Sequence, residues 1–148
     1  MFDKKTVRDI NLTNKRVLVR VDFNVPLKDG GVSDDTRIRA AMPTINYLIE
    51  NNASVILCSH LGRPKGKPDL NYSLRPVAKY LSNLIGRPVS FANDCIGESA
   101  FELAKQLKPG EVLLLENTKF HAVEKSNDPE MVKKLASLAD VFVMDAFG

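Results

Sequence analysis

Short apolar runs alternate with helix-length stretches along this chain, and a polar cluster directly follows four of the runs. The four segments are R-V-L-V-R-V-D-F-N (16–24), S-V-I-L-C-S-H-L-G-R (54–63), E-V-L-L-L-E-N-T-K-F-H (111–121) and D-V-F-V-M-D-A-F-G (140–148). This alternation predicts an α/β fold of right-handed βαβ units, with a mainly parallel sheet and helices on both faces. Because ligands bind outside the carboxyl ends of parallel strands, the polar clusters predict one shared site.

Turn and capping residues mark the boundaries of the predicted elements. Pro43 predicts a kink or break in the first long helix, and Gly86 a helix end. Residues 26–31 are predicted to form a turn. We expect strands at 15–21, 53–58, 87–91, 111–115 and 140–144, and helices from 33–36 to about 50, at 73–84, at 98–107 and from 127–130 onward.

Composition favours one soluble globular domain. The chain has 148 residues, of which 44% are hydrophobic, and a formal net charge of +3 without a long basic run. This charge density argues against a dedicated nucleic-acid binder, and no apolar run approaches the ~18 residues of a membrane span. The polar start of the chain is unlike a signal peptide, so we expect a cytosolic location. Cys58 and Cys95 form no C-x-x-C motif and are expected to be buried free thiols.

The chain stops at Gly148, immediately after a predicted strand that no further helix follows. A complete doubly wound domain would ordinarily cover that strand, so we expect this sequence to be a piece of a larger protein. An apolar strand at an open sheet edge can pair with another chain, which makes self-association of the piece possible.

The polar clusters are predominantly basic, which suits a small anion carrying phosphate or carboxylate. Asp22 and Asn24 point the same way from an extended segment and can meet one ligand, although either could simply cap the turn before Pro26. His60 and Arg63 flank Gly62, which allows the backbone to approach a ligand closely. The basic residues of these clusters are Arg37, His60, Arg63, Lys119 and His121.

Arg37 and Arg39 are expected in the first turn of a helix, where the helix dipole disfavours cations. An anion held between the arginine and the helix end would explain such a placement. An ion pair with Asp34 or Asp35 is the alternative, above all for Arg39.

Two nucleotide-binding signatures are missing from the sequence. The segment 62–68 superficially resembles a phosphate-binding loop, but its spacing is one residue short and Pro68 replaces the required Ser or Thr. No G-x-G-x-x-G motif occurs either. These residues therefore do not predict a nucleotide site in this chain.

Taken together, the clusters resemble the motifs of the phosphoglycerate kinase family in order and spacing. The resemblance covers essentially the whole chain but only the N-terminal part, somewhat under half, of the family's usual length. Lys119 stands where the family usually has Arg, and Met144 where it commonly has Asn. The matching segments are V-R-V-D-F-N-V-P-L (19–27), D-D-T-R-I-R-A (34–40), S-H-L-G-R-P-K-G (59–66), L-L-E-N-T-K-F-H (114–121) and A-D-V-F-V-M-D-A-F-G (139–148).

The resemblance implies two Rossmann-like domains joined by a hinge, with residues 1–148 supplying part of the N-terminal, phosphoglycerate-binding domain. It implies a monomeric glycolytic parent enzyme that transfers a phosphoryl group between 1,3-bisphosphoglycerate and ADP, giving 3-phosphoglycerate and ATP. Mg²⁺ and the nucleotide would bind to a C-terminal domain that this chain lacks, so the chain alone should not turn over. Arg37 would be catalytic, and the substrate-binding residues would be Asp22, Phe23, Asn24, Arg37, His60, Leu61, Gly62, Arg63 and Lys119.

Other functions remain open at this stage. The chain could be a small-anion binding module without turnover. An aspartyl-phosphate phosphatase of the haloacid dehalogenase type is a weaker possibility, since a strand leads into D-x-N at Asp22, but Asn24 cannot act as the second acid/base. Nucleic-acid binding is weaker still, because the charge is dispersed and aromatic residues make up only 7% of the chain.

Overall fold

The computed structural model describes residues 13–21, 23, 25, 27–28, 31–59, 73–92, 98–116 and 137–145. Strands and helices alternate between residues 31 and 115, as the sequence predicts. The elements are β1 (Arg16–Val21), β2 (Leu27–Lys28), β3 (Gly31–Val32), α1 (Thr36–Glu50), β4 (Ser54–Cys58), α2 (Arg75–Ile85), β5 (Val89–Ala92), α3 (Glu98–Gln106), β6 (Val112–Leu115) and β7 (Val141–Asp145).

Five of the strands form one sheet in the order β5-β6-β4-β1-β7. Every neighbouring pair in this sheet is parallel, which confirms the predicted α/β fold with a mainly parallel sheet. Strands β4 and β6 are buried along their whole length. Their continuously apolar sequences are therefore those of strands covered on both faces.

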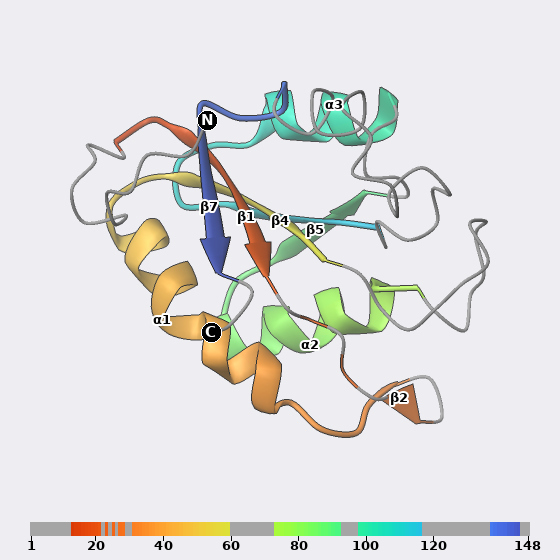
Figure 1. Cartoon of the computed structure of the whole chain (residues 1–148). Helices are drawn as coiled ribbons and strands as arrows, with labels where there is room; N and C mark the ends of the chain where they lie inside the picture. Colours follow the sequence, from red (N-terminus) through yellow and green to blue (C-terminus); the bar gives the residue numbers. More distant parts are fainter. Residues whose placement is uncertain are drawn as a thin grey trace.

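The sheet lies between two helical layers (Figure 1). One face packs against α1 and α2, and its core includes Val19, Leu57 and Leu114. The other face packs against α3, and its core includes Leu18 and Ile56. Consecutive strand residues such as Leu18 and Val19 thus enter opposite cores, as the two-residue period of a strand requires.

Helix α1 runs through Pro43 without a break, so the break that the sequence allowed does not occur. Proline removes one backbone N–H from the helix ladder, a defect that an exposed position tolerates better than a buried one. Pro43 is exposed, whereas the buried face of α1 continues on both sides of it. We attribute the continuity to this packing. The buried face consists of Ile38, Ala41, Ile45 and Leu48.

The predicted helix ends agree with the structure. Asn51 caps α1 and Asn52 follows with φ 61°, while Gly86 caps α2 with φ 72°, a left-handed conformation that favours glycine. None of the helices in the described ranges is long and apolar enough to cross a membrane.

One element was not predicted. The segment interpreted as a turn, 26–31, contributes to a small antiparallel hairpin in which Leu27 pairs with Val32 and Lys28 with Gly31. Strands of two residues are too short to show a hydrophobic period, so the sequence pattern could not reveal them. The helix expected from 127–130 lies outside the described residues.

Candidate functional site at the carboxyl edge of the sheet

Three of the polar clusters begin at adjacent points on one edge of the sheet. Strand β1 pairs with β4 so that Arg20 lies opposite Cys58, and β4 pairs with β6 so that Leu57 lies opposite Leu114. Continuing this register along each strand places Val21 beside Ser59, and Ser59 beside Glu116. The next residues along the chain are Asp22, His60 and Asn117. The register therefore brings together Val21, Ser59 and Glu116, the residues that directly precede three of the clusters.

The direction of the chain connections reverses at the same place. From β4 the chain passes through α2 to β5, which lies beyond β6. From β6 it returns across the sheet to β7, on the far side of β1. Neighbouring strands whose connections leave in opposite directions form a crevice at their carboxyl ends, which is where open α/β sheets bind ligands. Strands β4 and β6 are such a pair.

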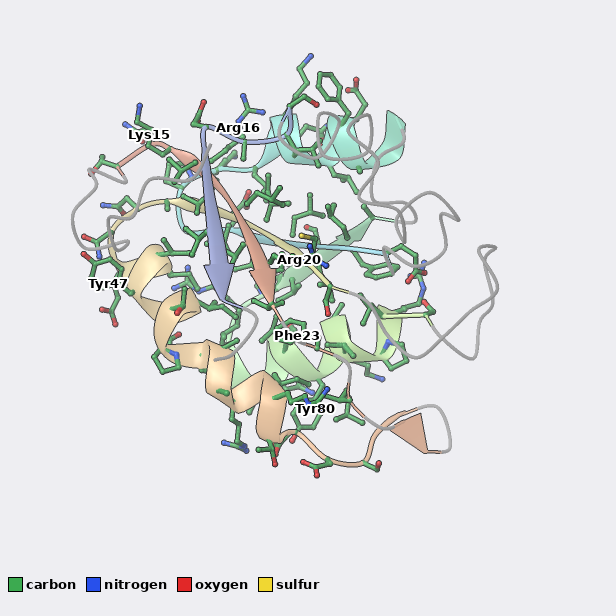
Figure 2. All side chains as sticks on the ribbon, viewed as in Figure 1. Lys15, Arg16, Arg20, Phe23, Tyr47 and Tyr80 are labelled. Atoms are coloured by element: carbon green, nitrogen blue, oxygen red, sulfur yellow. The ribbon has the colours of Figure 1, made fainter. Side chains whose placement is uncertain are left out.

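Ser59 holds the turn that follows β1. The backbone N–H of Phe23 donates a buried hydrogen bond of 2.9 Å to Ser59 Oγ. The Phe23 side chain is completely buried and belongs to the core beneath the sheet, between the tip of β1 and α2 (Figure 2). The residue between Asp22 and Asn24 is thus anchored on both its backbone and its side chain.

Glu116 connects the end of β6 to the start of α2. Its side chain accepts a 2.7 Å hydrogen bond from Ser73 Oγ and a 2.9 Å hydrogen bond from the Leu74 backbone N–H. Glu116 is buried, and a carboxylate at a helix N-terminus satisfies backbone donors that the helix itself leaves unpaired. Ser73 directly follows residues 60–72, and Glu116 directly precedes the cluster that contains Lys119. This contact therefore links the two positions in the fold from which these basic stretches of sequence continue.

The start of α1 is held by two carboxylates. Asp34 Oδ1 accepts hydrogen bonds from the Thr36 backbone N–H at 2.9 Å and from Thr36 Oγ1 at 2.7 Å. Asp35, the N-cap residue, accepts a 2.5 Å hydrogen bond from the Tyr80 hydroxyl of α2 and a 2.6 Å one from Arg39 Nε. Arg39 is therefore in the predicted ion pair with Asp35.

These contacts shift the titration of the groups involved. Hydrogen bonds from Thr36 lower the pKa of Asp34, and those from Tyr80 and then Arg39 lower the pKa of Asp35. The same bond to Asp35 raises the pKa of Tyr80, because the hydroxyl must keep its proton to donate. Both carboxylates are thus stabilised in their ionised form at the start of α1.

Arg37 is exposed in the first turn of α1. Residues two apart on a helix point about 200° away from each other, so Arg37 and Arg39 lie on different flanks. Arg39 pairs with Asp35 on one flank of the helix, and Arg37 lies on the other flank. Helix α1, whose first turn contains Arg37, starts on the side toward which the β1 and β7 arrows point (Figure 1).

Two of the predicted site residues, Phe23 and Arg37, are among the described residues. The structure gives the Phe23 side chain a place in the core, and its assignment to the substrate site stays a prediction. The buried state of Cys58 agrees with the sequence analysis, and within the described part of the chain no cluster of His, Cys, Asp or Glu could hold a metal ion. The predicted residues that lie outside the described ranges are Asp22, Asn24, His60, Leu61, Gly62, Arg63, Lys119, His121 and Cys95.

Three residues that organise this edge were not predicted from the sequence, namely Ser59, Glu116 and Tyr80. Each acts through a partner distant in sequence: 36 residues for Ser59, 42 and 43 for Glu116, and 45 for Tyr80. Periodicity reports only local neighbours. The weak signal available was a polar residue directly after a strand for Ser59 and Glu116.

Comparison with known proteins agrees with the resemblance found in the sequence. The profile of the phosphoglycerate kinase family matches residues 7–148. Phosphoglycerate kinases of Moorella thermoacetica and Chloroherpeton thalassium are 61% and 57% identical to 98% of this chain, which spans 37% and 36% of their lengths.

Solved structures give the same result. Phosphoglycerate kinase from Coxiella burnetii superposes with a TM-score of 0.83 at 43% identity, over 95% of this chain and 34% of that one. The Pyrococcus horikoshii enzyme superposes with a TM-score of 0.84 at 40% identity, over 95% of this chain and 36% of that one. Both the sequence profile and the fold lead to one conclusion: this chain belongs to the phosphoglycerate kinase family.

Proposed function

We propose that this chain is the phosphoglycerate-binding part of a phosphoglycerate kinase. The complete enzyme would transfer a phosphoryl group between 1,3-bisphosphoglycerate and ADP, giving 3-phosphoglycerate and ATP. The observation that carries the proposal is the strand register, because it places the carboxyl ends of β1, β4 and β6, which the Asp22, His60 and Asn117 segments follow in the sequence, at neighbouring points of the sheet edge. An aspartyl-phosphate phosphatase is not favoured, since the relatives are phosphoglycerate kinases.

Each cluster has a chemical role in this proposal. His60 and Arg63 bind the stable phosphate of the ligand, from two directions, with the backbone of Leu61 and Gly62 close by. Asp22 and Asn24 contact the hydroxyl and carboxyl end of the glycerate. Lys119 adds positive charge without the bidentate fork that the family's usual Arg provides, which makes its phosphate contact less directional.

Arg37 is the residue that would stabilise charge on the phosphoryl group as it is transferred. Phosphoryl transfer requires positioning and stabilisation of charge rather than a nucleophile or general base from the protein. A guanidinium suits this task because it stays protonated and presents several donors. Domain closure would bring the two substrates in line and exclude water.

The nucleotide would be held elsewhere in the longer enzyme. In this proposal MgATP or MgADP binds to a C-terminal domain, where the metal neutralises phosphate charge. This chain would then bind phosphoglycerate without turnover. ATP consumption by the chain alone would contradict that part of the proposal.

Calorimetric titration with 3-phosphoglycerate tests the assignment, with MgATP as a parallel ligand. We expect 3-phosphoglycerate to bind with one-to-one stoichiometry and MgATP not to bind. Arg63→Ala should abolish most of the binding. Arg87→Ala is the matched control, because it removes the same charge at a different place. Arg87 bonds to the Gly110 carbonyl, and these two residues precede β5 and β6, at the amino ends of the strands. Binding of MgATP alone, or equal loss in both variants, would contradict the proposal.

A further inference from the structure

The helix turn that carries Arg37 receives a side-chain hydrogen bond from α2, in addition to the packing of its own buried Ile38 in the core. Asp34 and Thr36 bond to each other, and Arg39 bonds to Asp35 within α1, so these contacts would move with the helix. The Tyr80 hydroxyl is different because it reaches Asp35 from another element, 45 residues along the chain. Figure 2 shows Tyr80 beside the first turn of α1.

Helix α2, which carries Tyr80, is packed into the core of the molecule. Val77, Ala78 and Leu81 on either side of Tyr80 are buried against the sheet, in the same core as the buried face of α1. The start of α2 is in turn held by Glu116. A hydrogen bond to an ionised carboxylate is also stronger than one between neutral groups. Tyr80 therefore connects the N-cap of α1 to a well-packed helix.

We propose that Tyr80 is a positioning residue for Arg37: by binding the N-cap residue Asp35, its hydroxyl fixes the turn from which the arginine reaches the transferring phosphoryl group. The inference rests on the proposed function, which gives Arg37 its catalytic role. Arg37 is two residues beyond Asp35 and exposed, so its placement depends on where this turn lies. Charge stabilisation in a transition state is sensitive to such placement.

The test uses a full-length enzyme made by joining residues 1–148 to the remainder of the Moorella thermoacetica relative. Tyr80→Phe removes only the hydroxyl and leaves the ring. We expect kcat to fall about tenfold with little change in KM for 3-phosphoglycerate, since a shift of about 1 Å in a catalytic group can cost up to ~100-fold. Tyr47→Phe is the control, because Tyr47 lies near the other end of α1 (Figure 2).

A double variant separates positioning from a general effect on the fold. If Tyr80 acts through Arg37, Tyr80→Phe should lower kcat in the joined enzyme that keeps Arg37. It should cause no further loss of kcat in the joined enzyme that carries Arg37→Ala. Equal losses in both backgrounds, or an unchanged kcat in Tyr80→Phe, would overturn the inference. If Arg37→Ala itself leaves kcat unchanged, the proposed role of Arg37 fails instead.

A second measurement needs no turnover. Nitrogen-15 relaxation of the Arg37 backbone amide and Nε in the 148-residue chain reports how well this turn is ordered. Tyr80→Phe should increase motion at Arg37, and Tyr47→Phe should not. Unchanged relaxation in Tyr80→Phe would overturn the inference even if the joined enzyme were inactive.

Discussion

The contacts of Asp35 make the start of α1 sensitive to acid. The hydrogen bonds from Tyr80 and Arg39 lower its pKa in the folded chain. A carboxyl group with a lowered pKa stabilises the folded state at pH values above its unfolded pKa of about 3.9. That contribution is lost as the pH falls through the folded-state pKa. The stabilising effect of the ionised Asp35 is thus complete at neutral pH and disappears in acid.

Replacing Asp35 with Asn should reveal this dependence. Asn can still accept from Tyr80 but carries no charge, so Asp35→Asn should lower the urea midpoint at pH 7. The difference from the parent chain should shrink as the pH is lowered from neutrality to below the unfolded aspartate pKa of about 3.9, on the way to the lowered pKa of Asp35 in the folded chain. Glu102→Gln, an exposed carboxylate on α3, is the control. A difference that stays constant over this range would contradict the expectation.

At the scale of elements, Glu116 shows how a strand end determines a helix start. Glu116→Ala leaves the buried Ser73 hydroxyl and Leu74 N–H without this acceptor. We expect the free energy of unfolding to fall by about 1–3 kcal/mol, the usual cost of unsatisfied buried polar groups. Because Glu116, which precedes the Lys119 segment, binds Ser73, which follows residues 60–72, we also expect 3-phosphoglycerate affinity to fall. Urea unfolding and calorimetric titration measure the two effects.

The control for Glu116 lies at the other end of the same helix. Ser82 Oγ donates an exposed 2.8 Å hydrogen bond to the Arg87 carbonyl, near the end of α2. Ser82→Ala should cost about 1 kcal/mol or less and leave the affinity unchanged. If both variants reduce affinity equally, the effect is one of α2 stability and not of the clustered strand ends.

The elements were largely predictable because their signals are local. Gly86 and Asn51 ended their helices as predicted, and the predicted strands in the described ranges are present with shifts of one or two residues at their ends. The β2–β3 hairpin was missed because its strands are too short to have a period. The contacts that organise the candidate site were less predictable. The sequence suggested the Arg39–Asp35 pair, four residues apart, but not the partner Tyr80, which tertiary packing brings to Asp35.

At the scale of the whole molecule, the scaffold and the candidate site are made of different residues. The β-sheet is stabilised by side chains buried on both faces, whereas the proposed ligand contacts follow the ends of its strands. Leu114 is an example of the first kind: it is fully buried on β6, between Leu57 and Phe91 of the neighbouring strands. Arg37 is an example of the second kind, exposed at the start of α1.

This separation predicts opposite effects for two truncations to alanine. Leu114→Ala should lower the free energy of unfolding by about 2–5 kcal/mol, because it opens a cavity in the core. Arg37→Ala should change it by less than about 0.5 kcal/mol, as exposed substitutions usually do, yet should nearly abolish turnover in the joined full-length enzyme. Urea unfolding measures the first quantity and steady-state kinetics the second. A strongly destabilised Arg37→Ala would mean that the arginine is part of the scaffold, whereas a Leu114→Ala chain of unchanged stability would mean that β6 does not lie in the core.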